Sequence, residues 1–278
     1  MSKVYQIITD KIIVAIEAGV CPWRKSWTGI DGMPKRFTGQ DYRGVNTFLL
    51  SLADFNQPIW MTYKQAKKVG AEVKKGSKAM PVTFFNFLKR ENKETGKETK
   101  IPMLRYYNVF NVEQLENVPE KYVSAVETFD HNPIQNCEEI LSDCPEIAGV
   151  THGGDKAYYR PSTDSIQMPN VENFTTREAY YCTLFHEMIH ATSKHLSRDL
   201  GNSFGSDDYA KEELIAELGA AMLCGVAGID NSTIDNSASY LANWLKRFKN
   251  DSKLIVSAAG QAQRAVDYIL GNSWEDAK

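Results

Sequence analysis

Apolar side chains recur every three to four residues along several stretches of the chain, which is the spacing of a helix with one buried face. The first of these stretches is followed closely by Gly19 and Pro22, two residue types that end helices. The last is interrupted near residue 250 by an Asn-Asp pair. The pattern therefore predicts helices over residues 4–18, 45–55, 62–69, 136–141, 176–196, 208–224 and 238–270.

Two other stretches, 81–88 and 101–112, are rich in aromatic and β-branched residues, which favour strands. The segment between them is strongly charged, so we predict a hairpin with a long solvated tip over 90–100. Two further short strands are predicted within 157–168, on either side of the turn-forming residues 161–164. The expected fold class is α+β. We expect a β-hairpin in an N-terminal (front) domain and a mainly helical C-terminal (back) domain that carries a small sheet.

The composition is that of an ordinary soluble globular protein, with 42% hydrophobic and 24% charged residues in a chain of 278. The purest apolar run near the start covers only residues 12–16, whereas a membrane-spanning helix needs ~20 residues. The first ten residues lack the pattern of a signal peptide. The five cysteines are odd in number and have no CxxC spacing, which argues against a disulfide framework and a cysteine-only zinc site. We therefore expect a cytoplasmic protein that does not contact membranes.

Charge is distributed unevenly along the chain. Residues 1–115 contain 19 Lys and Arg against 10 Asp and Glu, together with half of the 30 aromatic residues. The rest of the chain contains 13 basic and 25 acidic residues, so an excess of nine positive charges is joined to an excess of twelve negative ones. This asymmetry indicates two domains with different partners. We predict a basic, aromatic-rich domain over 1–115, a linker over 116–130 and a second domain over 131–278.

The strongest chemical signal is the pentapeptide His186-Glu187-Met188-Ile189-His190, which lies within a predicted helix. Residues four apart share one helix face, so both imidazoles can bind one ion at Zn–N distances of ~2.0–2.1 Å. Glu187 lies beside them and can take a proton from a metal-bound water. The motif therefore predicts one Zn²⁺ per chain, with Glu187 as general base.

A third ligand is available in the next predicted helix, where Glu213 and Glu217 share a face with small apolar residues. Carboxylates in such surroundings are costly to bury unless they are paired or bind a metal. We expect Glu213 to complete a His₂Glu site, and Glu217 to accept the second N–H of a ligating imidazole. Glu212 fits a solvated face of the helix better.

Other residues near the motif fit the ligand role less well. His195 is five residues after His190 and would point away from the metal on a continuous helix, so we expect it at the surface or at a helix end. Tyr209 is expected in the core, with oxyanion stabilisation as its alternative role. The reserve ligands are the aspartates of the loop that follows, Asp199, Asp207 and Asp208.

The front half interleaves aromatic and basic residues as single-stranded nucleic acid requires, with rings for the bases and cations for the phosphates. One group lies in a glycine-rich loop over 22–43, and a lysine-rich group follows beside Trp60 and Tyr63. The alternative is that the aromatic residues are core and the lysines form a solvated face. We expect contacts to single-stranded DNA from Trp23, Arg24, Lys25, Trp27, Lys35, Arg36, Arg43, Lys64, Lys67 and Lys68.

Several segments carry a resemblance to a known family. In the back half they are 157–161, 164–169, 186–192, Arg198, 209–217, 240–245 and 262–270. In the front half they run from Val4 through 22–25 and 44–46 to 106–111. Over nearly its whole length the chain resembles the ArdC-type antirestriction family.

That resemblance implies an N-terminal domain that binds single-stranded DNA and a C-terminal zincin-like metallopeptidase domain. It also implies that the glutamate opening the second helix, Glu213, is a metal ligand, although Glu212 stands before it where thermolysin-like proteins have Asn. The implied function is that of an antirestriction accessory protein of mobile DNA, a hydrolase with an unknown protein substrate.

Two classes of function stay open on the sequence. In the first, Glu187 activates the water that cleaves a protein, and the strand over 165–168 pairs with the extended substrate. In the second, the chain is a DNA-binding module whose metal is structural or vestigial. Glu187 favours the first, because a structural site needs no general base and is usually closed by four protein ligands. A nuclease or deaminase is a weaker alternative, since the sequence lacks the PCxxC element of nucleobase deaminases.

Overall fold

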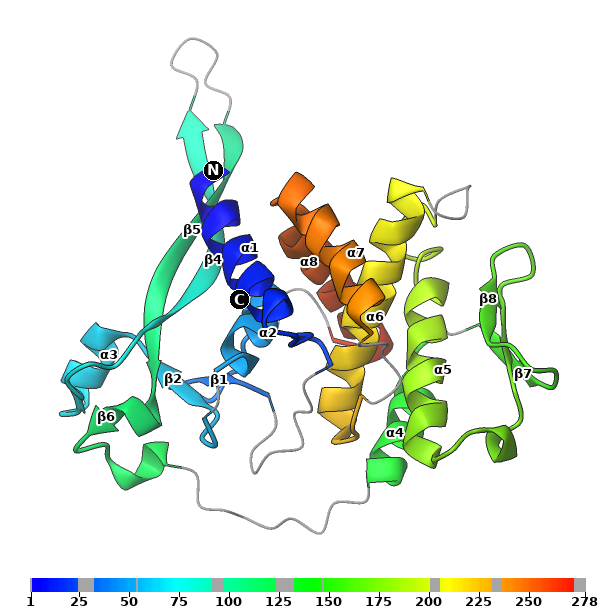
Figure 1. The fold of residues 1–278 in the computed structure, drawn as a ribbon, viewed down its shortest axis with the longest axis horizontal. Coiled ribbons are helices and arrows are strands. Elements are labelled where there is room, and N and C mark those ends of the chain that lie inside the picture. Colours follow the sequence, from blue (N-terminus) through cyan, green and yellow to red (C-terminus); the bar gives the residue numbers. More distant parts are fainter. Residues whose placement is uncertain are drawn as a thin grey trace.

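The computed structural model describes residues 2–24, 33–53, 55–91, 98–123, 133–146, 148–200, 206–231 and 237–272 (Figure 1). Its helices are α1 (Ser2–Glu17), α2 (Val45–Ser51), α3 (Tyr63–Lys68), α4 (Pro133–Asp143), α5 (Arg177–Ala191), α6 (Asp207–Ala227), α7 (Ala238–Asn250) and α8 (Leu254–Ile269). Its strands are β1 (Lys35–Arg36), β2 (Ile59–Met61), β3 (Glu72–Val73), β4 (Met80–Glu91), β5 (Glu98–Asn111), β6 (Leu115–Glu116), β7 (Gly149–His152), β8 (Tyr158–Arg160) and β9 (Ser165–Met168). The fold is α+β with a helix-rich back half, which confirms the expected class. None of the described helices is both long and apolar enough to cross a membrane.

A long two-stranded ribbon projects from the front part of the molecule (Figure 1). Its strands β4 and β5 are antiparallel and pair from Met80 with Val109 to Glu91 with Glu98. This confirms the predicted hairpin, although its strands extend into the predicted tip, through 90–91 and 98–100; residues 92–97 lie outside the described residues. Strands β1 and β2 extend the sheet in the order β1-β2-β5-β4, so the base of the ribbon is anchored in a sheet.

Side-chain caps determine where the helices begin. Thr62 Oγ1 accepts the backbone N–H of Gln65, and the Gln65 side chain accepts that of Thr62, which is the capping-box geometry at the start of α3. Thr176 and Ser206 cap α5 and α6 by accepting an N–H of the first turn. Helix α6 ends at Gly228, whose φ of 76° is the left-handed conformation that favours glycine. These caps place α5 and α6, which carry the candidate site.

A small sheet lies at the opposite end of the molecule from the ribbon (Figure 1). Its strand order is β7-β9-β8, so β9 is paired on both sides, in parallel with β7 and antiparallel with β8. The expectation that residues 165–168 pair with an extended substrate is therefore wrong, because both edges of β9 are occupied. Both edge strands contact α5: β8 packs along it, and His152 of β7 is hydrogen-bonded to Tyr180 of α5.

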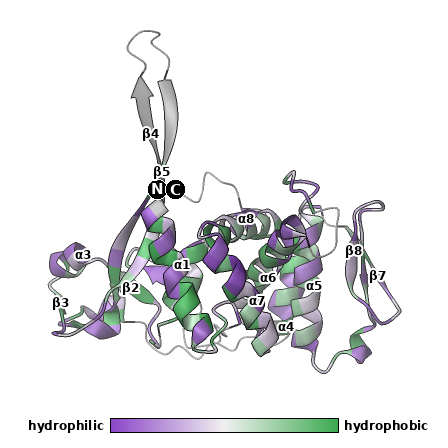
Figure 2. Cartoon of the chain, turned by 45° about the horizontal axis from the view of Figure 1, so that its top comes forward, coloured by the Kyte–Doolittle hydropathy of each residue, from purple (hydrophilic) through white to green (hydrophobic). Residues whose placement is uncertain are grey.

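The largest core cluster surrounds α6, which packs against α5 and α8. Figure 2 shows hydrophobic residues along α1, α6 and α8, which lie close together. The apolar stripe of α1, with Ile8, Ile12 and Ile16, is buried in this cluster, and so are Trp23 and Phe48. The front and back parts of the chain therefore share one core, whereas two smaller clusters are confined to residues 37–122.

The predicted division into two domains and a linker stays a prediction. Residues 124–132, which include much of the predicted linker, lie outside the described residues. What the structure adds is that α1 contacts α7 and α8 of the back part, so the first helix contributes to both regions.

Candidate metal centre

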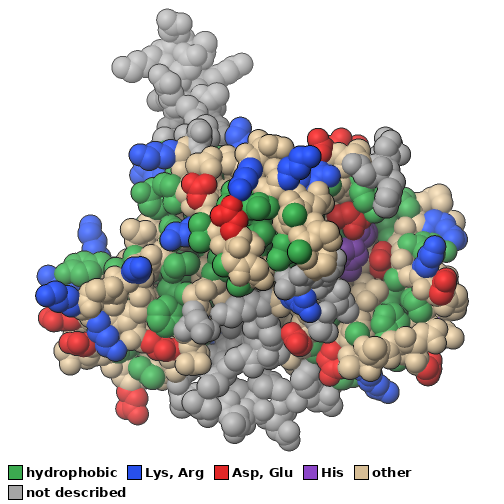
Figure 3. Space-filling view, in the orientation of Figure 1, with side chains coloured by type: hydrophobic (Ala, Val, Ile, Leu, Met, Phe, Trp, Pro, Cys, Tyr) green, Lys and Arg blue, Asp and Glu red, His purple; other side chains and the backbone are tan. Residues whose placement is uncertain are grey.

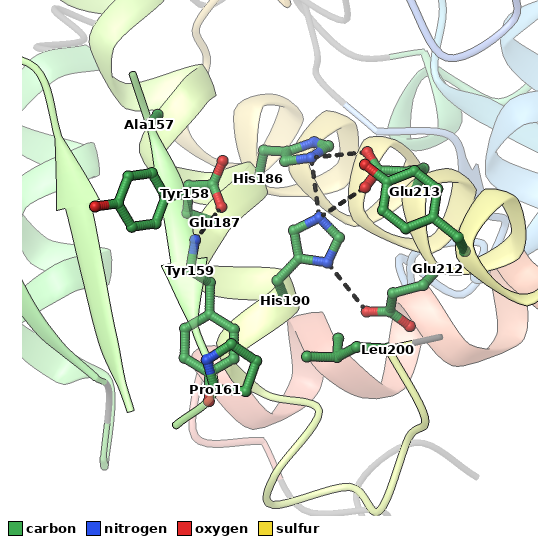
Figure 4. A pocket seen from close by; sticks show the side chains of 11 residues that line it. Ala157, Tyr158, Tyr159, Pro161, His186, Glu187, His190, Leu200, Glu212 and Glu213 are labelled. Carbon is green, nitrogen blue, oxygen red and sulfur yellow. Dashed lines mark hydrogen bonds and ion pairs between the residues drawn. The ribbon is translucent and has the colours of Figure 1, made fainter. Parts of the chain in front are cut away.

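Helix α5 presents two histidines toward α6 (Figure 4). Its other faces are buried. Phe185, Met188 and Ile189 belong to the largest core cluster and have no accessible surface. His186 and His190, four residues apart, remain partly accessible, with side chains 26% and 12% exposed. The apolar pattern of α5 thus determines the direction in which both imidazoles point.

Three ligand groups converge at this edge of α5. The Nε2 atoms of His186 and His190 lie 3.1 Å apart, and the Glu213 carboxylate of α6 lies 3.6 Å from the first and 3.7 Å from the second (Figure 4). Two nitrogens bound tetrahedrally to one Zn²⁺ at ~2.0–2.1 Å are roughly 3.3 Å apart, so this spacing fits one shared ion. Within the described residues, these three form a cluster whose donor atoms all lie within 4.8 Å of one another.

The electrostatics of the cluster favour a bound cation. Burial by itself raises the pKa of the Glu213 carboxyl, but the hydrogen bond with His186 and the nearby imidazoles outweigh burial and leave this pKa lowered. Burial by itself lowers the pKa of His186, but Glu213 and Glu187 outweigh it and leave this pKa raised. Both directions show that positive charge is favoured among these three side chains.

The second nitrogen of His190 faces a buried ion pair. Its Nδ1 lies 3.3 Å from Glu212 Oε1, and Glu212 accepts hydrogen bonds from Arg198 Nη2 and Nε at 2.9 and 3.2 Å. The Arg198 and Glu212 side chains are only 4% and 3% exposed. A carboxylate that accepts from Nδ1–H leaves the Nε2 lone pair free to bind an ion and holds the ring in place.

Two predictions for α6 are wrong here. Glu212 is buried and paired rather than solvated, and it takes the position opposite the imidazole that was expected of Glu217. Successive helix residues point about 100° apart, so Glu212 and Glu213 approach α5 from two sides while Glu217 lies one turn further along. Arg198 follows α5 and also donates to Ile189 O. Its ion pair with Glu212 is the reason that Glu212, and not Glu217, is buried beside His190.

Glu217 binds a different pair of side chains. Its Oε2 accepts the indole N–H of Trp23 at 3.1 Å and the hydroxyl of Tyr240. Burial raises the pKa of this carboxyl to about 7, against the opposing effect of the two hydrogen bonds. Because Trp23 belongs to the front part of the chain, that part contacts the helix that carries Glu213 directly.

Glu187 lies between the histidines and the edge strand β8 (Figure 4). Its Oε2 accepts the backbone N–H of Tyr159 at 2.8 Å, which fixes the carboxylate beside His186. A cavity of about 410 Å³ opens here, with β8 on one side and Glu213 on the other. The arrangement places a carboxylate base, a ligand cluster and a strand edge around one space.

Tyr209 also lines this cavity, so the expectation that it belongs to the core is wrong. It is hydrogen-bonded to Glu213. Burial, with the charge of Glu213, raises the pKa of the Tyr209 hydroxyl to about 12, which keeps it a proton donor at neutral pH. Its alternative role, oxyanion stabilisation, fits this position.

The other residues weighed as ligands lie apart from the described cluster. The ring of His195 stacks on Tyr268, with the ring centres 4.8 Å apart. Asp207, at the start of α6, forms an ion pair with Arg247. Neither residue belongs to the group of His186, His190 and Glu213 that the described chain brings together.

Two residues predicted to contact DNA are used inside the fold. Trp23 has no accessible surface and packs edge-on against Trp244 and Phe248. Its predicted role in base stacking is therefore wrong, because a ring without accessible surface cannot receive a base. Arg43 forms an ion pair with Asp267 of α8, so it also joins the front part to the back part.

The other residues predicted to contact DNA are at least partly exposed or lie outside the described residues. Lys64, Lys67 and Lys68 are exposed on α3, and Figure 3 shows lysine and arginine side chains on that side of the molecule. Arg24, Lys35 and Arg36 are half-buried. Lys25 and Trp27 lie outside the described residues.

Two families match successive parts of the chain. Residues 2–110 match the N-terminal domain of anti-restriction factor ArdC, and residues 136–261 match a zincin-like metallopeptidase family. Two crystal structures of the antirestriction ArdC protein from the R388 plasmid are 38% identical to the chain. The metal-free structure has a TM-score of 0.77 and aligns over 95% of this chain and 96% of its own. The Mn(II)-bound structure has a TM-score of 0.76, with 96% and 97% covered.

Relatives found by sequence include both short and long proteins. Protein y4eC of Sinorhizobium fredii is 33% identical, and the alignment covers 96% of this chain and 92% of y4eC. Two DNA primase TraC proteins of Escherichia coli are 34% identical over 96% of this chain. The chain spans only 20% and 27% of their lengths, so it is similar to one segment of these larger proteins.

Proposed function

The chain belongs to the ArdC antirestriction family, and from that premise we propose that it binds single-stranded DNA with its front part and hydrolyses a protein at a zinc centre in its back part. The observation that carries the proposal is the convergence of His186, His190 and Glu213 on one point, with Glu187 beside them in a cavity. Three protein ligands leave a fourth position for water, which favours a hydrolytic site over a structural one.

The donor set supports Zn²⁺ as the ion. Two imidazoles and one carboxylate are the ligands of the His₂Glu zinc peptidases, and a crystal structure of the related ArdC protein is Mn(II)-bound. When bound, a divalent cation supplies an acidified water and polarises the carbonyl of the substrate.

The side chains around the ligands perform the proton transfers. Glu187, held by the Tyr159 N–H, accepts the proton of the water whose oxygen attacks the peptide carbonyl. As the C–N bond breaks, Glu187 returns that proton to the amine nitrogen. The hydroxyl of Tyr209 donates to the carbonyl oxygen, on which negative charge develops. An extended substrate lies along β8, the strand whose edge contains Tyr159.

The front part supports DNA binding through its charge. Its excess of nine positive charges and the exposed lysines of α3 suit contacts to phosphates, which tolerate any base sequence and weaken with salt. Coating a strand requires no hydrolysis, so the two activities are separable by mutation. We place both in the cytoplasm, in keeping with the five free cysteine thiols.

The test uses the full chain, with a library of unfolded peptides as substrate and mass spectrometry as readout. Glu187→Gln keeps the shape of the side chain but removes the base, so we expect loss of cleavage with about one zinc equivalent and DNA binding retained. His186→Ala is expected to lose most of the zinc as well. Glu172→Gln, at an exposed glutamate near the start of α5, is the matched control with wild-type cleavage.

The outcomes separate the proposed function from its alternative. Cleavage by Glu187→Gln at the wild-type rate would exclude the assigned base. A wild-type protein that binds zinc and DNA but cleaves no peptide would identify a DNA-binding module with a structural or vestigial metal.

A further inference from the structure

Exposed aromatic rings gather on one region of the front part. Among the described residues, six aromatic side chains are exposed, and five of them lie on α3 or on the β4–β5 ribbon. These five are Tyr63, Phe84, Phe85, Tyr106 and Tyr107. Apolar side chains clustered in water mark a binding surface more often than a chance exposure. Because Trp23 is buried, a base that stacks on the front part has to use a ring that is exposed.

The pleat of the ribbon divides its rings between two faces. Phe84 pairs with Arg105 and Tyr107 pairs with Val82, so Phe84 and Tyr107 are diagonal neighbours on one face. Such neighbours are typically ~7–8 Å apart, within reach of one flat ligand. Phe85 lies on the opposite face, one residue along β4. The two faces are therefore distinguishable by mutation.

The face with Phe84 and Tyr107 is one wall of a pocket of about 490 Å³, which we call the ring pocket. The segment around β1 and the start of α3 provides the other wall, which includes Arg36 and Gln40. The base of the pocket is firm, because Tyr42 is only 4% exposed and belongs to a core cluster with Val82. Tyr42 and Tyr107 are also hydrogen-bonded to each other.

Arg36 brings a guanidinium group to the lining of the ring pocket. Its guanidinium lies over the Tyr42 ring, with Cζ 5.7 Å from the ring centre, and its Nη1 donates to Gln40 at 3.4 Å. Its Nε is shielded from solvent and has no acceptor in the part of the chain that the structure describes. Because Nε is shielded, the nitrogens of this guanidinium that can donate to a ligand oxygen are the terminal ones.

We propose that the ring pocket binds one nucleobase of a single strand, stacked on Phe84 and flanked by Tyr107, with Arg36 donating to an oxygen of the same nucleotide. This inference rests on the proposed DNA binding and locates it on the ribbon. Bases of a duplex stack on one another, so an isolated aromatic wall selects an unpaired base. The exposed lysines of α3 lie beside the pocket and suit the flanking phosphates, which makes a nucleic acid strand a better occupant than a peptide.

The experiment compares two fluorescent strands of equal length on the full chain, oligothymidylate and an abasic strand with the same phosphates. Wild-type protein is expected to bind the abasic strand about 5- to 150-fold more weakly, the factor that corresponds to ~1–3 kcal/mol per stacked base. Phe84→Ala is expected to weaken oligothymidylate binding by a similar factor and to leave binding of the abasic strand unchanged. Phe84→Trp, which keeps a ring, restores the difference between strands.

Phe85→Ala is the matched control, since Phe85 is 53% exposed against 48% for Phe84 and lies on the other face of the ribbon. It should bind both strands as the wild type does. If instead Phe85→Ala weakens binding and Phe84→Ala does not, the ring pocket is not the base site. If wild-type protein binds both strands equally, phosphates alone are bound: the ring pocket is overturned and the proposed DNA binding stands. If it binds neither strand, the proposed DNA binding itself fails.

Discussion

The indole N–H of Trp23 lies 3.1 Å from Oε2 of Glu217, and this contact joins the front part of the chain to the helix of the metal centre. Glu217 is one turn beyond Glu213, the proposed metal ligand on α6, and Tyr240 of α7 donates to the same oxygen. The position of α6 therefore depends on a residue near the start of the chain as well as on its neighbours in the back half.

Trp23→Phe keeps a ring at this position but removes its donor. We expect the free energy of unfolding to fall by about 1–3 kcal/mol more than loss of ring area alone would cause, because the buried carboxyl group of Glu217 loses one of its two donors. Urea denaturation of the full chain checks this value. Trp244→Phe is the matched control, because Trp244 Nε1 has no acceptor among the described residues, so that variant loses only ring area. Equal losses in the two variants would contradict a role for the hydrogen bond.

Glu212→Gln tests the buried partner of His190. Because the carboxylate holds the ring through Nδ1–H, we expect zinc affinity to fall about 10- to 100-fold, measured by competition with a fluorescent chelator. Glu217→Gln is the comparison, since Glu217 contacts Trp23 and Tyr240, and it should retain wild-type affinity. If Glu217→Gln lowered the zinc affinity and Glu212→Gln did not, Glu217 would be the carboxylate that holds the imidazole.

The raised pKa of Glu217 gives a pH dependence in the metal-free protein. The folded state keeps this proton up to about pH 7, whereas the unfolded state releases it near 4.5. The group therefore lowers the free energy of unfolding as the pH rises from 4.5 to 7, by about 3 kcal/mol in total at ~1.36 kcal/mol per pKa unit. Glu217→Gln carries no such proton, so its stability relative to the wild type should rise across this window and level off above pH 7.

The pKa of Glu213 is shifted in the opposite direction to that of Glu217, so Glu213 serves as the control for that titration. Its pKa is lowered in the folded state, so its contribution to stability is present above pH 4.5 and is lost as the pH falls further. Denaturation curves measured with a chelator at several pH values separate the two groups. Parallel wild-type and Glu217→Gln stabilities from pH 5 to 7 would contradict the assigned pKa direction.

Zinc should raise the thermal stability of the full chain. An ion at about 100 times its Kd stabilises the folded state by ~2.7 kcal/mol, which raises the Tm of a chain of this size by roughly 5–10 °C. A chelator is expected to reverse the shift, and His186→Ala to abolish it. His195→Ala should keep the shift, because that ring stacks on Tyr268 away from the ligands. A full shift in His186→Ala would exclude this site.

Elements specified by short-range physics were predictable from the sequence. The capping box of Thr62 and Gln65 and the break after Asn250 involve residues a few positions apart, and the structure has helix ends at both. The spacing of His186 and His190 likewise needs only one helix. Strands β1 and β2, with two and three residues, are too short to show any periodicity and were missed.

The parts that sequence reasoning missed depend on partners that are distant along the chain. Glu212 and Glu217 lie on one helix, and their roles are decided by Arg198 and Trp23, which are 14 and 194 residues away. Trp23 is followed by Arg24, and an aromatic residue beside a basic one is typical of a DNA-binding loop. A tryptophan buried in a core can have the same neighbour in sequence, so the pattern does not separate the two. Only packing against Trp244 distinguishes the two.

The burial of α1 among the helices of the back half has a consequence for whether the two family segments can exist as separate chains. A gene break between the two family segments would leave Ile8, Ile12 and Ile16 in water on one product and uncover the surface of α7 and α8 on the other. The apolar stripe of α1 would then lack the helices that bury it, whereas the two smaller core clusters within 37–122 would stay on the first product. The alignments with the TraC primases and with y4eC, each over 96% of this chain, run through both segments. In these three relatives the two segments therefore occur together on one chain, as the shared core requires of this one.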